Sequence, residues 1–430
     1  MIKSRKLKLV LAVAAAAMIH GASQKTAFAT GDTWVANSPT ANNWDSPGAW
    51  QGNNPPQAGD DLYFNGSGTS VSNNDLNGLS VNSISFRGAY TLTGNSLTMT
   101  RGLYIQTELS GVVDTIKLSG IDGQYLQFGT GGYGGYSNGT VAFAGSGNTY
   151  TFDADTGLWA QGQTGTATID AGNDEIEFSG GAYIGTKETK NKVMVKITGD
   201  SGGKISFDDT IHLELFGTIN FAGAQTTVLS GDNTGPGSLL QTGSGTTTLA
   251  GNNDYSGNTV VSHGVLDITG AISASEITVD GGTLTGPGGS VQSVSMDSGA
   301  ITAHDADNPT GTLSINSLTT SGGTLEFNVG KESVVDLIKV SGVANLGSAT
   351  GLQFYFAYIK GAGPIPGENV AILSAQNLKN QMAGFTDGVG KTVNRNGMLV
   401  TPYIGGSKPV GDANPGTNPN TIYVYVSSGK

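Results

Sequence analysis

Short stretches in which apolar β-forming side chains alternate with polar ones recur along most of the chain. Residues 140–144, 192–197 and 218–221 are examples, each close to turn-forming residues such as Gly and Asn. An alternation with a period of two predicts a β-strand with one buried face. After the N-terminal region no stretch keeps a helical stripe of apolar residues, and residues 374–381 are the best candidate, for at most one short helical turn. The pattern therefore predicts an all-β protein.

Strands this short and this closely spaced fit either tandem β-sandwiches or a solenoid. The turns recur in similar form, since residues 145–151 and 251–256 both combine Gly, Asn and Tyr. A turn that repeats along a chain is typical of coils that stack on one another to bury their apolar sides. We therefore predict a right-handed parallel β-helix, with tandem β-sandwiches as the alternative.

The N-terminus has the pattern of a secretory signal peptide over residues 1–29. A cationic start precedes a short apolar run at 9–19, and Ala27-Phe28-Ala29 is a small-x-small cleavage signal. The apolar run is too short to span a bilayer comfortably. We expect cleavage between Ala29 and Thr30, secretion or display at the cell surface, and no transmembrane anchor in the mature chain.

Three regions are expected after the leader: an N-terminal cap at 30–75, a β-helix body at 76–310 and a C-terminal β module at 311–430. Residues 421–426 are expected to form a closing edge strand. The cap region contains Trp34, Trp44 and Trp50, three of the four tryptophans. Terminal repeats of a solenoid must cover an exposed core, which favours a structural role for these rings. A carbohydrate-stacking patch is the alternative, because indole faces suit sugar rings.

Composition and charge narrow the function further. The formal net charge is −12, and the leader alone carries five Lys or Arg and no acidic residue, so the mature chain is more acidic still. Nucleic acids and anionic membrane surfaces are disfavoured as partners, because both need a basic face. The chain has no Cys, which excludes disulfides and thiolate metal sites.

The sequence contains few candidates for catalytic or metal-binding residues. His212, His263 and His304 form no metal-binding or catalytic motif, and no calcium-loop or phosphate-loop pattern occurs. Clustered acidic residues could instead supply the two carboxylates that cleave a glycosidic bond. The candidates lie close together in the sequence: Asp170, Asp174 and Glu175. Acids on a solvated strand explain the same pattern, so we predict no catalytic residue, no metal and no cofactor.

Residues 245–266 carry a more specific signal. They resemble the autotransporter-associated β-strand repeat, also called the passenger-associated transport repeat, at eight positions: Leu249, Gly251, Asn253, Tyr255, Gly257, Thr259, Gly264 and Leu266. The N-terminal and 311–373 segments are similar to the opening and closing modules of secreted proteins with such repeats. The resemblance implies an exported passenger-type β-helix, and we expect it here without a C-terminal membrane barrel.

The sequence thus predicts a noncatalytic secreted or cell-surface β-helix with an adhesion or envelope/matrix structural role. Its expected partners are polysaccharides, other cell-surface components or copies of itself. The alternative is a carbohydrate-binding or carbohydrate-cleaving β-helix, with Trp34, Trp44 and Trp50 as sugar contacts.

Overall fold

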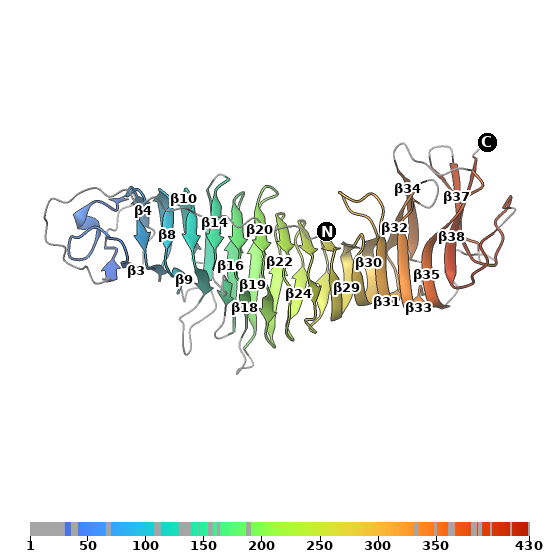
Figure 1. The fold of residues 1–430 in the computed structure, drawn as a ribbon, viewed down its shortest axis with the longest axis horizontal. Coiled ribbons are helices and arrows are strands. Elements are labelled where there is room, and N and C mark those ends of the chain that lie inside the picture. The colour runs from blue at the N-terminus through green and yellow to red at the C-terminus, as the bar shows by residue number, and fades with distance from the viewer. Residues whose placement is uncertain are drawn as a thin grey trace, which may run out of the picture.

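The computed structural model is all-β and elongated (Figure 1). It describes residues 31–35, 42–65, 70–106, 113–128, 139–145, 147–153, 158–160, 164–185, 191–330, 334–347, 351–359, 366–379, 385, 389–395, 398–412 and 415–428. These residues form 38 strands and one short 3-10 helix, η1 (Pro47–Ala49), with no α-helix in the described ranges. The expected signal peptide lies outside them.

The strands stack in three parallel columns, with at most one strand per column in each coil of this part of the chain. The first column is an 8-stranded parallel sheet that continues through a bridge between His212 and Thr234 into β26 (Asn252–Asn253). Its eight strands are β1 (Gly31–Thr33), β3 (Asp61–Phe64), β6 (Ser83–Phe86), β9 (Gly102–Ile105), β12 (Tyr125–Phe128), β15 (Leu158–Ala160), β18 (Ala182–Ile184) and β21 (Ile211–Leu213).

The second and third columns run beside the first. The second contains β2 (Asn42–Asn43), β4 (Ser70–Asn74), β7 (Tyr90–Gly94), β10 (Val113–Leu118), β13 (Gly139–Phe143), β16 (Gly165–Asp170), β19 (Val193–Thr198), β22 (Gly217–Phe221), β24 (Ser238–Gln241) and β27 (Thr259–Val261). The third contains β5 (Ser80–Val81), β8 (Leu97–Met99), β11 (Ile121–Gly123), β14 (Thr149–Phe152), β17 (Glu175–Phe178), β20 (Lys204–Phe207), β23 (Thr226–Leu229), β25 (Thr246–Leu249) and β28 (Val265–Ile268).

Toward the C-terminus the corners of the coil straighten and strands merge across columns. β29 (Ala271–Thr285) and β30 (Ser290–Thr302) pass through all three columns. β31 (Thr312–Thr320), β33 (Leu337–Asn345) and β35 (Asn369–Lys379) continue the first two, while β32 (Thr324–Val329) and β34 (Gln353–Tyr358) continue the third. Uninterrupted parallel pairing from rung to rung is a parallel β-helix and excludes tandem sandwiches; its right-handed sense stays a prediction.

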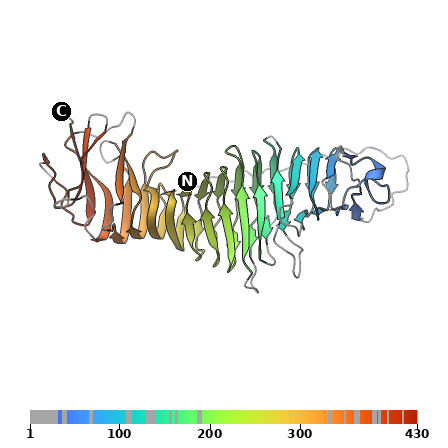
Figure 2. The same ribbon diagram turned by 180° about the vertical axis from the view of Figure 1, so that it is seen from behind.

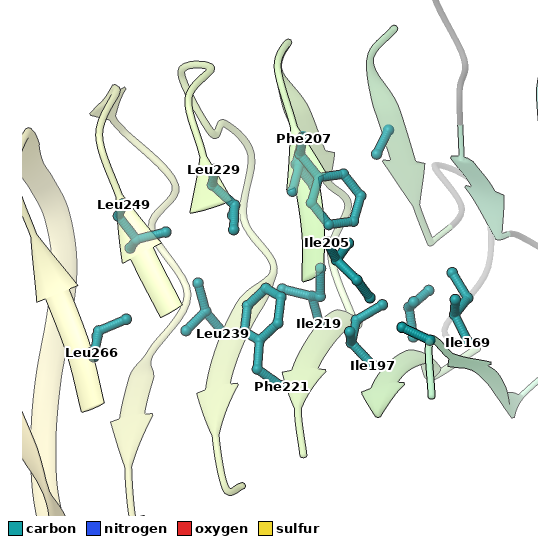
Figure 3. Close-up of a cluster of buried hydrophobic side chains, with 14 of the residues drawn as sticks. Ile169, Ile197, Ile205, Phe207, Ile219, Phe221, Leu229, Leu239, Leu249 and Leu266 are labelled. Atoms are coloured by element: carbon teal, nitrogen blue, oxygen red, sulfur yellow. The ribbon is translucent and has the colours of Figure 1, made fainter. Parts of the chain in front are cut away.

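The core lies between the columns, as the alternation predicts. In β19 every second residue is buried, and the inward positions of successive rungs stack directly on one another. One such row in the third column joins Phe152, Phe178, Phe207, Leu229 and Leu249, and the rings of Phe178 and Phe207 stack 4.8 Å apart. Figure 3 shows Phe207, Leu229 and Leu249 of this row. Like-on-like stacking in register lets apolar side chains fill the interior without disulfides.

The C-terminal end of the rod combines parallel and antiparallel pairing. Parallel pairing continues past residue 311 as far as β35, so the change of architecture comes there, where the chain turns into an antiparallel sheet of β35, β38 (Thr421–Ser428), β37 (Met398–Ile404) and β36 (Val393–Arg395) (Figure 2). β38 pairs on both sides, so residues 421–426 are not an edge strand. The possible helical turn at 374–381 is also wrong as far as the described residues reach, because β35 is strand through Lys379.

Candidate binding face

The repeat residues identified in the sequence hold adjacent rungs together. Asn253 is fully buried, and its side-chain oxygen accepts hydrogen bonds from the backbone N–H and the side-chain amide of Asn233, at 3.1 and 2.5 Å. Its Nδ2 donates to the carbonyl oxygens of Gly251 and Ala271, at 2.9 and 3.0 Å. One amide thus links three successive coils, which explains why the motif needs Asn here: an amide both donates and accepts.

A second buried polar chain starts at Tyr255. Its hydroxyl lies 2.6 Å from Thr259 Oγ1, which lies 2.8 Å from Ser275 Oγ, and the Ser275 hydroxyl donates to the Gly257 carbonyl. Burial raises the pKa of Tyr255 to about 12, so the hydroxyl keeps its proton. A Cβ on Gly257 would lie 2.1 Å from the Gly237 carbonyl oxygen, so only glycine lets the rungs approach.

The remaining motif positions are structural as well. Leu249 and Leu266 are buried and point into the interior (Figure 3), and Gly264 has a φ of 59°, which suits a residue without Cβ. All eight motif residues therefore build the coil, and none is an exposed contact residue: Leu249, Gly251, Asn253, Tyr255, Gly257, Thr259, Gly264 and Leu266.

The tryptophans of the N-terminal cap are core residues. Trp34, Trp44 and Trp50 are only 3, 0 and 1% exposed, and their rings meet edge to face around Trp50 at 5.0 and 5.7 Å. Each indole N–H has an internal acceptor: Ser70 Oγ, Ser72 Oγ and the Trp44 carbonyl, respectively. This corrects the carbohydrate-contact alternative, because a sugar ring needs an exposed indole face.

The three candidate acids lie in different settings. Asp174 is 1% exposed, and its carboxylate accepts hydrogen bonds from the backbone N–H groups of Gly145, Gly147 and Asn148 at 2.6–2.9 Å. It therefore fixes a turn of the preceding coil. Asp170 accepts from the Gly172 N–H at the end of β16, in the second column, whereas Glu175 opens β17 in the third.

The histidines differ in role. His263 is exposed in a turn of the repeat. His304 lies between Thr302 and Asp336, a combination that resembles a hydrolase triad in composition, but Thr302 Oγ1 and Asp336 Oδ2 both contact its Nδ1, at 2.6 and 2.5 Å. A proton relay needs the two partners on opposite ring nitrogens. The hydrogen bond with buried Asp336 raises the pKa of His304 and makes this group a structural clamp.

His212 belongs to a cluster that the sequence did not reveal. On the outer surface of the first column its Nε2 lies 3.1 Å from Glu214 Oε1, and its Nδ1 lies 2.9 Å from Thr234 Oγ1. The Tyr183 hydroxyl donates to the same Glu214 oxygen at 2.6 Å, and its ring stacks on the imidazole at 5.5 Å. Burial and the neighbouring Glu214 carboxylate raise the pKa of Tyr183. The result is a prearranged set of hydrogen-bonding groups.

An exposed apolar turn borders this cluster. Leu215 and Phe216 are 53 and 38% exposed, and Phe216 has a φ of 68°, which is rare for a bulky side chain. Such strain persists where surrounding structure enforces it and is frequent at functional sites. Here the Gly217 N–H bonds to the Glu214 carbonyl and the Val193 N–H to the Phe216 carbonyl, which hold the turn in place.

The same column presents further contact groups along its length. Tyr104 and Tyr125 meet edge to face on β9 and β12, with their hydroxyls in contact. Beyond the cluster, the column opens into a cavity of about 300 Å³ on β29, β30, β31 and β33, lined by apolar residues together with polar ones that include Ser273, Gln292, Asn316, Lys339 and Ser341. We call this outer surface, from Tyr104 to Ser341, the first-column face.

Comparison with known proteins places the repeat in a family. Residues 239–268 match the sequence model of the passenger-associated transport repeat. The chain carries such a repeat. The match runs from β24 to the end of β28, and so covers the coil whose Asn253 and Tyr255 networks are described above.

This chain is also similar to a protein whose name describes it as extracellular. Over 59 residues it is 46% identical to an extracellular serine protease of Serratia marcescens. The aligned part is 14% of this chain and 6% of that protein, so the chain spans only a small fraction of its relative. The repeat and this relationship indicate a secreted or cell-surface β-helix. Among the described residues, no helix has the length and apolar character to cross a membrane.

Proposed function

We propose that this protein is a noncatalytic adhesion or envelope/matrix component, secreted or held at the cell surface, that binds extended partners along its first-column face. The observation that carries the proposal is the Tyr183–His212–Glu214 cluster beside the exposed Leu215–Phe216 turn, on a face that runs the length of a rigid rod. Polysaccharides, other cell-surface components and copies of the chain are the candidate partners.

In this proposal, binding is multivalent, because contacts on successive rungs add to one another. Outer side chains of successive rungs are held about 4.8 Å apart by the parallel ladder, so a polymer aligned with the rod meets a contact group at each step. Individually weak contacts then act together, because each one raises the effective concentration of the next. A preorganised surface also limits the entropy lost on binding.

Sedimentation of the labelled mature protein with envelopes of its native cells tests the binding role. We expect wild type to cosediment, and the double variant Leu215→Ser/Phe216→Gly and the single variant His212→Ala to bind at least about tenfold more weakly, the loss of roughly 1.4 kcal/mol. Val410→Ser is the matched control, since Val410 is 99% exposed in the connection between β37 and β38, outside this face. Equal binding by all four proteins would refute the assignment of the face.

A separate assay tests the absence of catalysis. The protein is incubated with a panel of polysaccharides and new reducing ends are measured, with Asp170→Ala and Glu175→Ala as comparisons. We expect no release above buffer. Cleavage by wild type that disappears in either variant would replace the adhesion role by a carbohydrate-cleaving one.

A further inference from the structure

Asp267 is a buried carboxylate on the outer surface of the helix. It lies in β28 of the third column, where its rung neighbours are Thr248 and Thr285. Those positions face outward, yet Asp267 is only 6% exposed. The segment that follows β30 passes beside it, since the Thr285 hydroxyl donates to the His304 carbonyl and Asp305 comes next in the chain.

The hydrogen bonding of Asp267 is incomplete. Its Oδ1 is buried without a partner, and Oδ2 has only the Thr248 hydroxyl at 3.4 Å. Burial, followed by the charge of Asp305 and then that of Asp307, raises the pKa of Asp267 to about 6. An ionised carboxylate that is removed from water and placed beside other negative charges is unfavourable, unless a bound cation compensates its charge or a proton neutralises it.

The neighbouring loop is held firmly enough to present its own carboxylate. Asp305 Oδ1 accepts hydrogen bonds from the N–H groups of Asp307 and Asn308 at 2.8 and 2.5 Å, and the Asn308 amide donates to both Asp305 oxygens. The far end of the loop is anchored where the Gly311 N–H donates to buried Asp336 at 3.0 Å. The loop therefore holds Asp305 in a fixed place beside the rung that contains Asp267.

We propose that Asp267 and Asp305 bind a divalent cation of the Ca²⁺ class that ties the 303–311 loop to the third column. The described residues contain no group of three or more His, Asp or Glu placed to hold a metal, so backbone carbonyls and water must complete the shell. Ca²⁺ accepts such mixed oxygen ligands in irregular geometry, whereas Mg²⁺ demands a near-ideal octahedron. The nearest imidazole nitrogen, His304 Nδ1, already contacts Asp336 and Thr302, which disfavours zinc.

The test uses the mature protein, stripped with EDTA and titrated with CaCl2 at pH 7.5 by calorimetry and thermal unfolding. Wild type should bind one ion and unfold at higher temperature with Ca²⁺, with a smaller response to MgCl2 and none to NaCl of equal ionic strength. Second-shell changes at metal sites already weaken binding tenfold or more, so Asp267→Asn and Asp305→Asn should each weaken it by at least about tenfold.

Asp254→Asn is the matched control, because it removes one carboxylate charge from an exposed position two rungs from β30. Asp267→Asn preserves the shape of the side chain and removes charge repulsion, and circular dichroism checks that this variant folds. If it does not fold, Asp305→Asn provides the test, because this substitution changes only the loop. A flat calcium titration of wild type, or equal affinity in wild type and the folded aspartate variants, would overturn the proposal. So would a loss of affinity in Asp254→Asn as large as in Asp267→Asn.

Discussion

The amide of Asn253 offers the sharpest test of how the repeat stabilises the coil. Asn253→Ala removes four hydrogen bonds and leaves the Asn233 N–H and the carbonyls of Gly251 and Ala271 without their side-chain partner in the interior. Each bond contributes about 0.5–1.5 kcal/mol net, so the loss of four bonds should lower the free energy of unfolding by about 2–6 kcal/mol. The loss should be concentrated in the three rungs that the amide links.

Urea unfolding measures the global change, and backbone hydrogen exchange over residues 233–271 measures the local one, which matters because repeat arrays can unfold in parts. Asn252→Ala is the matched control, because the Asn252 side chain is exposed and the backbone N–H of this residue donates to Asp232 Oδ1 at 2.7 Å. The control should change stability by less than about 0.5 kcal/mol. If Asn253→Ala behaves like this control, the amide does not hold the rungs together.

Three further outcomes follow from the core and the charges. Phe178→Ala opens a cavity between Phe152 and Phe207 and should lower the free energy of unfolding, measured in urea, by about 3–5 kcal/mol. A decrease of less than about 1 kcal/mol would contradict this prediction. Trp44→Ala should increase proteolysis of the N-terminal cap and leave binding to polysaccharides unchanged, because Trp44 is buried. A selective loss of polysaccharide binding in this variant would support the alternative that the tryptophans contact sugars. The third outcome concerns pH and is measured by paired urea titrations with EDTA present. Because the pKa of Asp267 is raised in the folded state, the free energy of unfolding of wild type relative to Asp267→Asn should fall by about 1–2 kcal/mol as the pH rises from about 4 to 6, and should stay level above pH 6. An increase in this relative stability between about pH 4 and 6 would contradict the prediction.

The period-two pattern was sufficient to predict the strands and their inward faces, because alternation and burial coincide in elements such as β19. It also located the repeat, whose glycines and Asn253 have local structural causes. Residues 374–381 were less readable: their polar composition suggests a turn, yet β35 becomes a strand because β33 and β38 pair with it from either side. Tertiary pairing overrides local preference in such segments.

The candidate site could not be read from the sequence because coil length varies. Tyr183 and Glu214 are 31 residues apart, whereas Asn233 and Asn253, also joined across rungs, are 20 apart. Without a fixed period, no spacing rule brings Tyr183, His212 and Glu214 together. Composition favoured a structural cap for the tryptophans but left sugar binding open, because aromatic residues near a terminus can cap a core or bind a ligand, and only burial separates the two.

At each end of the rod, the first column is covered by a segment that does not continue the parallel ladder. At the last rung β38 lies antiparallel along β35, and at the first the backbone of residues 49–51 pairs with Thr33 and Val35 beside β1. Among the described residues, the terminal strand of the first column is therefore already paired on its outer side at both ends, which disfavours extension of this column by a second molecule. We expect a filament or layer of this protein to grow sideways, through contacts between flanks, so that its thickness is set by how many rods lie abreast rather than by how many coils one chain contains.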